Sequence, residues 1–271
     1  MSIVVNTNIG SLNAQRSLAE SSRELSTAME RLSSGKKINS AADDAAGFAI
    51  AERMTAQVRG LNMATKNAND GLAMLATIEN ATNDVTDMLQ RIRELAVQAA
   101  NDTNGAQDRT YLQTEVDSLV AEINRVSTDT VYNDSVVLDG NLSGSLQVGT
   151  ASGQTIDFAI TSIDAATLGV DGLDFTDATT AATALTAIDS AIETVAGNRA
   201  GYGALSNRLE YTVSNLMNVA EFTTAARSRI EDADFAAESA RLAKAQVLQQ
   251  TGTAMLAQAN ASSQLAIQLI R

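Results

Sequence analysis

The sequence predicts a mainly α-helical protein of long antiparallel helices, with coiled-coil termini and a small β-hairpin region in the centre of the chain. Three observations lead to this fold class. Proline is absent from all 271 residues, which removes the commonest cause of a helix kink. Apolar residues recur at three- and four-residue steps in both the N-terminal and the C-terminal parts of the chain. Between these parts, short β-like runs alternate with turn residues.

The N-terminal segment carries a narrow apolar seam. Leu18, Leu25 and Leu32 recur every seven residues, which is typical of a coiled-coil helix. We expect Asn6 or Ser11 to cap this helix at its N-terminus. A lone helix cannot bury such a seam, so the helix needs a partner from elsewhere in the chain or from another copy.

A short connector follows the third of these leucines. Gly35 allows the chain to leave the helix through the left-handed region. We expect Asn39 or Ser40 to cap the next helix, with Asp43 and Asp44 in its positive first turn. The two carboxylates could instead form an acidic pair for metal binding or catalysis, but the capped turn explains both of them.

The connector also contains a Gly-Lys pair that resembles the end of a phosphate-binding loop. The earlier glycine of such a loop is absent, because Glu30 occupies its position, and Lys37 replaces the Ser or Thr that would hold magnesium. A nucleotide site is therefore not expected. Lys36 and Lys37 are predicted to contact acidic neighbouring subunits.

Two long helices are predicted next. Helical spacing of apolar residues continues from about Ala41 to Ala100, and some fifty helical residues would form a rod about 75 Å long. Gly60 and Gly71 weaken this helix locally without ending it. The turn cluster Asn101–Gly105 then predicts a second helix antiparallel to the first, ending near residues 125–128.

The centre of the chain has a different character. The runs Val136–Leu138, Leu146–Val148 and Ile156–Ile160 are separated by Gly-containing turns, which predicts hairpins. Residues 130–200 hold nine acidic residues and one basic residue, and so eight of the thirteen net negative charges, which indicates a solvated surface.

Helical spacing returns near Ala181, and we expect Gly197, Gly201 and Gly203 to form a loop before the last long segment. That segment ends in a pair of heptad seams in which small residues alternate with larger ones. The members of these seams are Ala245, Leu248, Gly252, Met255, Ala259, Ser262, Ala266 and Leu269.

Antiparallel pairing of the two ends of the chain would bury the N-terminal and C-terminal seams together. Such a pair is only two helices thick, so its outer faces must meet other subunits, and head-to-tail contacts give a ring or an open helical filament. The residues expected in inter-subunit packing are Leu18, Leu25, Leu32, Leu248, Met255, Leu265 and Leu269.

Composition excludes several classes of function. Cysteine and histidine are both absent, which excludes disulfides, thiolate or imidazole metal ligands and His-based catalysis. We therefore expect no enzyme activity, cofactor or metal. A net charge of −13 argues against nucleic acid or an anionic membrane as a partner. Neither a membrane span nor a secretory signal is predicted.

Four stretches of the sequence together resemble bacterial flagellin, and the resemblance covers about residues 1–130 and 200–271. The stretches are Leu32–Ile50, Leu89–Asn101, Glu122–Val126 and Ile230–Arg271. The resemblance implies an extracellular subunit that polymerises into the flagellar filament and is exported by the flagellar type III pathway without a cleaved signal. A hook–filament junction protein of the same family is the alternative. An extracellular enzyme or sugar-binding module would have to occupy the centre, which offers too few aromatic residues and no nucleophile–base set.

The resemblance also implies a division of labour along the chain. Residues 1–40 with 232–271 would form a coiled-coil domain of an inner tube, and residues 41–231 an outer rod with a short β-rich variable region at about 131–200. The implied partners are further copies of the chain, an export chaperone on the C-terminal helix, the filament cap and the hook-junction proteins.

One implied partner belongs to the host. In flagellins that resemble this chain, Toll-like receptor 5 recognises residues that match Arg91, Leu95 and Glu115. The alternative interpretation is that Arg91, Arg93 and Glu94 form a solvated rod face with local ion pairs.

Overall fold

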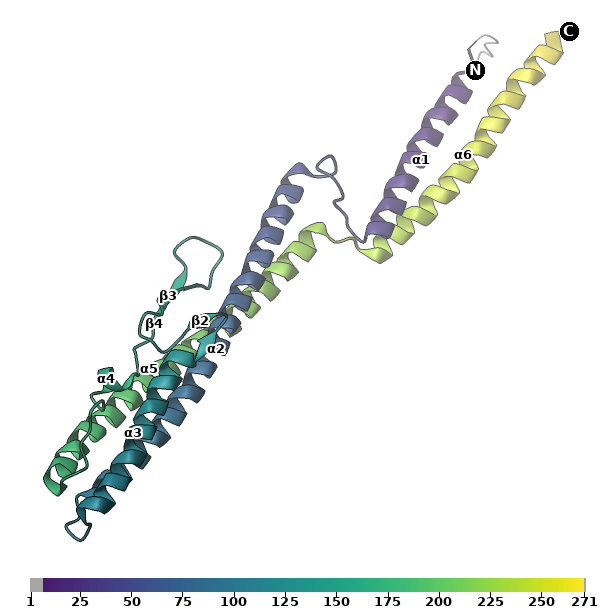
Figure 1. Ribbon diagram of the computed structural model, residues 1–271. Helices are drawn as coiled ribbons and strands as arrows, with labels where there is room; N and C mark the ends of the chain where they lie inside the picture. Colours follow the sequence, from purple (N-terminus) through teal and green to yellow (C-terminus); the bar gives the residue numbers. More distant parts are fainter. Residues whose placement is uncertain (1–6, 271) are drawn as a thin grey trace. The chain divides into compact units, whose positions relative to one another are not determined.

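A computed structural model describes the backbone of residues 7–270 and the side chains of residues 7–262 (Figure 1). The chain forms two compact units, which we call the terminal unit (residues 1–56 with 222–271) and the central unit (residues 57–221). The elements are α1 (Ile9–Ser34), α2 (Ala45–Ala99), α3 (Ala106–Asp129), β1 (Val131–Tyr132), β2 (Ser135–Val136), β3 (Ser143–Gln147), β4 (Thr155–Ala159), α4 (Ala165–Leu168), α5 (Ala178–Glu231) and α6 (Phe235–Ile270).

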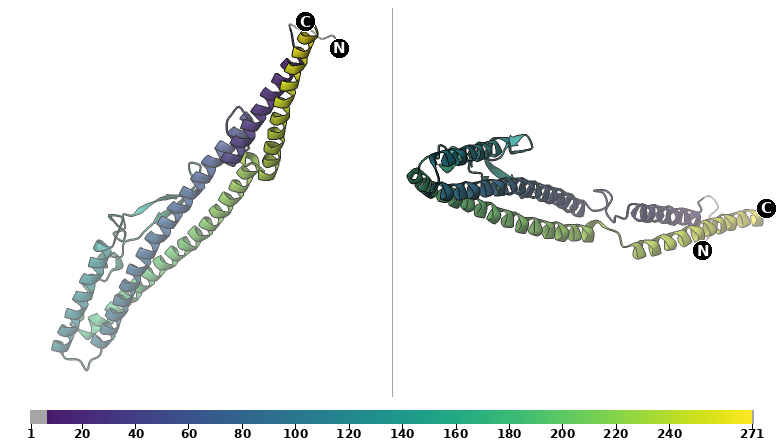
Figure 2. Two further views of the ribbon diagram at one scale, coloured as in Figure 1. Left: turned by 90° about the vertical axis from the view of Figure 1, so that its right-hand side faces the viewer. Right: turned by 60° about the horizontal axis from the view of Figure 1, so that its bottom comes forward.

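In the terminal unit, α1 and α6 lie side by side and run antiparallel (Figures 1 and 2). The Asn8 side-chain amide donates to the Ala259 carbonyl at 2.9 Å near the start of α1. Arg31 pairs with Glu238 at 3.3 Å near its end. The predicted pairing of the two ends of the chain is confirmed.

The N-terminal cap of α1 differs from the expectation. Asn8 caps the helix, because its side-chain oxygen accepts a hydrogen bond from the Ser11 backbone N–H at 3.1 Å. The expected cap at Ser11 is therefore wrong, since Ser11 lies inside the first turn, and Asn6 lies outside the described residues. At the other end, Gly35 adopts φ 70°, the left-handed conformation that its position predicted.

In the central unit, three long helices enclose the main apolar core (Figure 1). Helix α2 extends without a break through Gly60 and Gly71, as predicted. The turn Asn101–Gly105 reverses the chain into α3, and Arg109 stabilises it by donating to the Ala99 carbonyl at 2.9 Å. The largest fully buried side chains are Leu75, Ile78, Val85, Leu89, Ile92, Leu95, Ile123, Leu138, Ile163, Phe175, Ile188 and Leu209.

Helix α5 is continuous, so the loop predicted at Gly197, Gly201 and Gly203 is wrong. These glycines lie on the exposed side of the helix, and no atom lies within 4 Å of the place that a Cβ would occupy at any of them. The opposite side of the same turns is buried through Val195 and Leu209. Burial of that face outweighs a glycine penalty of about 1 kcal/mol at each position.

The β-hairpin region is confirmed, although the bounds of its strands differ from the predicted runs. β1 and β2 are joined through Asn133 and Asp134, whose φ angles of 49° and 63° indicate a type I′ turn. β3 pairs antiparallel with β4. Val137 and Leu138 lie beyond β2 and are fully buried, so only Val136 of this expected strand pairs in a sheet and the other two residues contribute to the core.

Two glycines of α2 permit close approach of the β3–β4 hairpin. A Cβ at Gly71 would lie 2.5 Å from Leu146 Cδ1, and one at Gly60 would lie 2.9 Å from Thr150 Cγ2. The Asn67 side-chain amide also donates to the Gln147 carbonyl at 3.0 Å. Gly60 and Gly71 lower the helix propensity of α2, but because they lack a side chain they also form the surface on which the hairpin packs.

Candidate functional site

The contact between α1 and α6 consists largely of small side chains. Ser21 and Ala28 of α1 and Ala245 of α6 are buried at the contact, whereas the three predicted heptad leucines are only half-buried. A Cβ at Gly252 would lie 3.3 Å from Leu18 Cδ1, so the glycine brings the two helices close together. Small residues at the seam leave little apolar area buried within the chain itself.

The larger residues of the C-terminal seams are not buried by α1. Leu248 is 40% exposed and Met255 is 64% exposed, so the expectation that α1 would bury both seams is wrong. Leu256 is half-buried at the contact instead. The side chains of Leu265 and Leu269 lie outside the described residues.

Leu248 and Met255 line a groove of about 480 Å³ along one edge of the helix pair, which we call the apolar groove. Its α1 side is made of small and polar residues. The complete lining is Gly10, Asn13, Ala14, Ser17, Ser21, Leu248, Thr251, Gly252, Met255, Gln258, Ala259 and Ser262.

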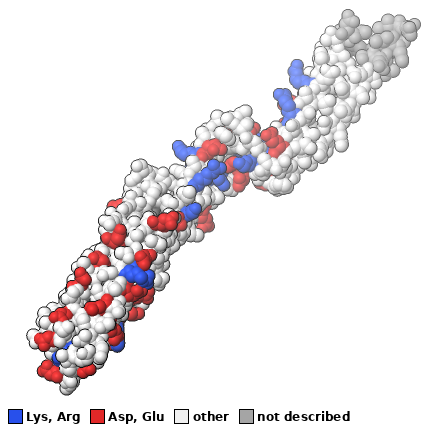
Figure 3. Space-filling model, viewed as in Figure 1, with Lys and Arg blue, Asp and Glu red and all other residues white. Residues whose placement is uncertain are grey.

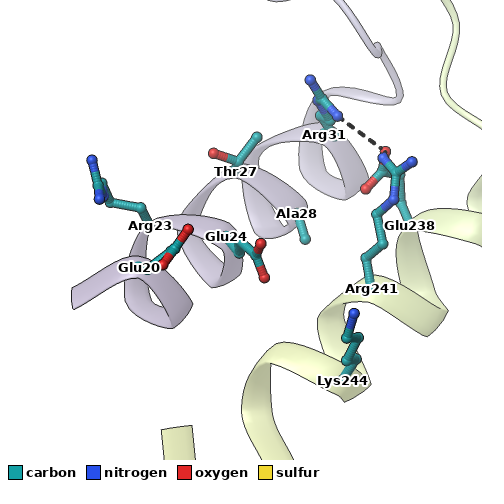
Figure 4. A pocket seen from close by; sticks show the side chains of 9 residues that line it. All are labelled: Glu20, Arg23, Glu24, Thr27, Ala28, Arg31, Glu238, Arg241 and Lys244. Atoms are coloured by element: carbon teal, nitrogen blue, oxygen red, sulfur yellow. Dashed lines mark hydrogen bonds and ion pairs between the residues drawn. The ribbon is translucent and has the colours of Figure 1, made fainter. Parts of the chain in front are cut away.

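A second hollow of about 560 Å³, the charged cleft, lies between the same two helices (Figure 4). Glu238 is buried at one end of it and accepts hydrogen bonds from Arg31 at 3.3 Å and from Arg241 at 2.8 Å. The sequence alone does not indicate this cluster, because Arg31 and Glu238 lie 207 positions apart. The remaining lining is Glu20, Arg23, Glu24, Thr27, Ala28 and Lys244.

The connector is tied to the end of α5. Lys36 forms an ion pair with Glu231 and a β-bridge with Asp232, and the Lys37 backbone N–H donates to the Glu231 carbonyl at 2.6 Å. The Lys36 ammonium is therefore paired within its own chain, and its predicted contact with a neighbouring subunit stays a prediction. Among the described residues, Lys37 forms no ion pair, and its side chain is exposed.

The two connector carboxylates have separate structural roles. Asp44 caps α2, because its Oδ1 accepts hydrogen bonds from the N–H groups of Ala46 and Gly47 at 3.1 and 3.0 Å. The expected caps, Asn39 and Ser40, are wrong, since their own N–H groups donate to Asp43 at 3.1 and 2.9 Å. The bond from Ser40, followed by that from Asn39, lowers the pKa of the Asp43 carboxyl.

The three residues matched to receptor recognition lie in the central unit, but they differ in exposure. Arg91 pairs with Glu115 at 2.8 Å across α2 and α3, and with Glu94 at 2.9 Å on its own helix. The hydrogen bonds that Arg91 donates to these carboxylates, the one to Glu94 first, raise the pKa of Arg91. Leu95 is 1% exposed and belongs to the core. A surface contact at this place would therefore be made by the charged pair.

Large apolar side chains are exposed along the terminal helix pair. Besides the members of the apolar groove, they include Ile9, Leu12, Met29, Phe235 and Val247, each more than half exposed. Among the described residues, no group of His, Cys, Asp and Glu is placed to hold a metal ion. No helix in the described part of the chain is long and apolar enough to cross a membrane.

Residues 5–143 match the family profile of the bacterial flagellin N-terminal helical region, and residues 185–270 match that of the C-terminal helical region. A flagellin of Halalkalibacterium halodurans is 42% identical over 272 residues, which cover 99% of this chain and 100% of that protein. The chain belongs to the bacterial flagellin family. The flagellar filament 33 kDa core protein of Treponema phagedenis is 40% identical, again over 99% of this chain and 100% of that protein.

Solved structures agree with this family. The crystal structure of Bacillus cereus flagellin is 32% identical, with a TM-score of 0.51 over 56% of this chain and 88% of that one. Flagellin is a family of structural proteins, and this member is a subunit of the flagellar filament. Nothing in these matches favours the hook–filament junction protein as the alternative.

Proposed function

We propose that the α1–α6 pair is the part of this filament subunit that forms the inner tube. In this assignment residues 1–40 and 232–271 pack into the tube, and residues 41–231 form the outer layer, with the variable region at 131–200. The observation that carries the proposal is the row of exposed apolar side chains on a helix pair whose internal contact is made of small residues. Exposed apolar surface of this extent marks an interaction site.

The buried area explains why assembly would be favourable. Met255 and Phe235 are each 64% exposed in the single chain. Burying a large apolar side chain completely is worth about 1.5–3 kcal/mol, and a filament repeats each contact along its length. Neighbouring subunits can therefore supply the apolar burial that the α1–α6 contact lacks.

Met255→Asp tests this assignment. A charge at an apolar subunit contact costs several kcal/mol when it is desolvated without a partner, so the variant should not polymerise. Met255→Leu is the matched control and should form filaments like the unchanged chain, because it keeps the apolar volume. Sedimentation and negative-stain microscopy would measure both. Normal filaments from Met255→Asp would contradict the assignment of α6 to the inner tube.

The same exposed face of α6 is the segment that an export chaperone would cover before assembly. Val247, Leu248 and Met255 present its apolar surface. We also propose that the chain is exported by the type III pathway without a cleaved signal and that it contacts the cap and the hook-junction proteins. The family resemblance supports these proposals. A chaperone complex that survives deletion of residues 245–271 would contradict the chaperone assignment.

Recognition by Toll-like receptor 5 is also part of the proposal. It would use Arg91 and Glu115 at the surface, with Leu95 supporting α2 from the core. A receptor reporter assay on Arg91→Ala should show reduced signalling. An unchanged response would leave the ion pairs of Arg91 as a purely local feature of the rod.

A further inference from the structure

We propose that the edge of the α1–α6 pair is a groove that receives the outer face of α1 from a second copy, with the two α1 helices parallel. This inference rests on the proposed assembly function and specifies which surfaces meet. The outer face of α1 and the groove are different surfaces, so each copy can insert its α1 into one neighbour and receive the α1 of another. Such a head-to-tail contact propagates into a ring or a helical filament.

The charged cleft and the apolar groove are two halves of one surface, which we call the assembly groove. Its α6 positions advance by three or four residues, so they share one edge of the helix. The α1 positions on the facing edge do the same. The α6 positions are Arg241, Lys244, Leu248, Thr251, Met255, Gln258 and Ser262.

The assembly groove has a direction. Near the connector, where Arg31 meets Glu238, its lining is charged (Figure 4). Toward the start of α1 the lining changes to Gly10, Ala14 and Met255, and among its described residues this half contains no charged side chain. An occupant should therefore be charged at one end and apolar at the other.

The outer face of α1 has this pattern in the same direction. Ile9 and Leu12, near the start of the helix, are 63% and 54% exposed. Arg16 and Glu30 follow four and eighteen residues after Leu12 along the same face, and both are exposed. The apolar halves coincide only if the incoming α1 is parallel to the α1 that lines the groove. An antiparallel helix would place Glu30 over Met255.

Charges at the connector end also match. Glu30 and Lys244 form no ion pair in the part of the chain that the structure describes. Arg241 pairs with the buried Glu238, yet its own side chain is 63% exposed. A parallel second copy brings its Glu30 next to Arg241 and Lys244. The groove carries one more positive than negative side chain at this end, which favours a carboxylate from outside.

Charge reversal in the full-length chain tests the pairing. Lys244→Glu and Glu30→Lys each place like charges at the contact, and each should raise the critical concentration for polymerisation on the order of tenfold. The double variant restores opposite charges and should return to near the value of the unchanged chain. An equimolar mixture of the two single variants should also polymerise, because each supplies what the other lacks.

The absence of cysteine makes a second measurement clean. Glu30→Cys and Lys244→Cys are made in separate chains, which are mixed, polymerised and oxidised. A disulfide-linked dimer should form in the filaments but not between the monomers. The matched control is Ser152→Cys with Lys244→Cys, because Ser152 lies in an exposed loop of the central unit and should not cross-link.

The outcomes separate this inference from the function on which it rests. If the unchanged chain forms filaments while Lys244→Glu keeps the same critical concentration, or while Glu30 and Lys244 fail to cross-link, the groove assignment is overturned and the assembly function stands. If the unchanged chain forms no filaments, the proposed function fails first. Rescue by the double variant supports the pairing, because misfolding of either single variant could not be repaired by a second reversal.

Discussion

The two units of the chain bury very different material. In the central unit, Phe175 and fifteen Leu, Ile and Val side chains are at most 2% exposed. In the α1–α6 pair of the terminal unit, the buried residues among those described are Ser11, Ser21, Ala28, Glu238 and Ala245. The central unit therefore holds its fold through its own core. The contact within the helix pair buries too little apolar area to stabilise the pair as the core stabilises the central unit.

Charge divides the chain along the same line. The terminal unit has 11 basic and 10 acidic residues, whereas the central unit has 8 basic and 22 acidic ones. Figure 3 shows carboxylates spread over the central unit, and the described part of α1 and α6 is mostly uncharged in this view. Central units that meet as neighbours repel one another, and salt screens this repulsion. The attraction between subunits must then come mainly from the helix pair.

The largest expected effect compares a buried residue of the central unit with a half-buried residue of α1. Ile92 is fully buried in the central unit, and Ile92→Ala should lower the free energy of unfolding of that unit by about 2–5 kcal/mol. Leu25→Ala, in the half-buried seam of α1, should leave this transition unchanged in the unassembled chain. Urea unfolding followed by circular dichroism measures both.

Ile92→Val serves as the graded control and should cost about 0.5–1.5 kcal/mol. If Leu25→Ala weakened the central unit as much as Ile92→Ala does, the two units would share one cooperative transition and the comparison between them would fail.

The long helices could be predicted because their apolar spacing is unambiguous. Between Leu61 and Ala99 the repeating residues are mostly buried, and the end of α1 at Gly35 followed from the need for a left-handed residue. The hairpin region was also predictable, but the turn at Asn133 and Asp134 was missed, since neither residue is a glycine.

The face of α6 could not be predicted, for a physical reason. Leucines lie both three positions before and three positions after Ala245, so Leu242 and Leu248 are equally good candidates in the sequence for contact with α1. The buried pair of Glu238 with Arg31 lies on the side that places Leu242 inward. In the sequence, a carboxylate such as Glu238 predicts an exposed position. Glu238 can be buried because it pairs with Arg31, which lies 207 positions away in the chain.

The smallest expected effect tests how the centre of the chain is fixed to α5. Tyr202 is 6% exposed, and its hydroxyl oxygen accepts a hydrogen bond from the Thr161 backbone N–H at 3.2 Å. Tyr202→Phe leaves that N–H without its partner and should lower the free energy of unfolding by about 1 kcal/mol at pH 8. Tyr211→Phe is the control, because Tyr211 is 80% exposed and should change nothing.

Alkaline pH sharpens the Tyr202 test. Burial raises the pKa of the Tyr202 hydroxyl, although the hydrogen bond from Thr161 acts in the opposite direction. The stability that this group contributes is therefore complete below the pKa of an unfolded tyrosine, about 10, and is lost as the pH rises through the higher folded pKa. The unchanged chain should lose this contribution above about pH 10, whereas the Phe variant has no hydroxyl to ionise there. The difference between the two chains should consequently shrink from pH 8 to pH 11. A constant difference over that range would mean that Tyr202 ionises as readily in the folded chain as in the unfolded one.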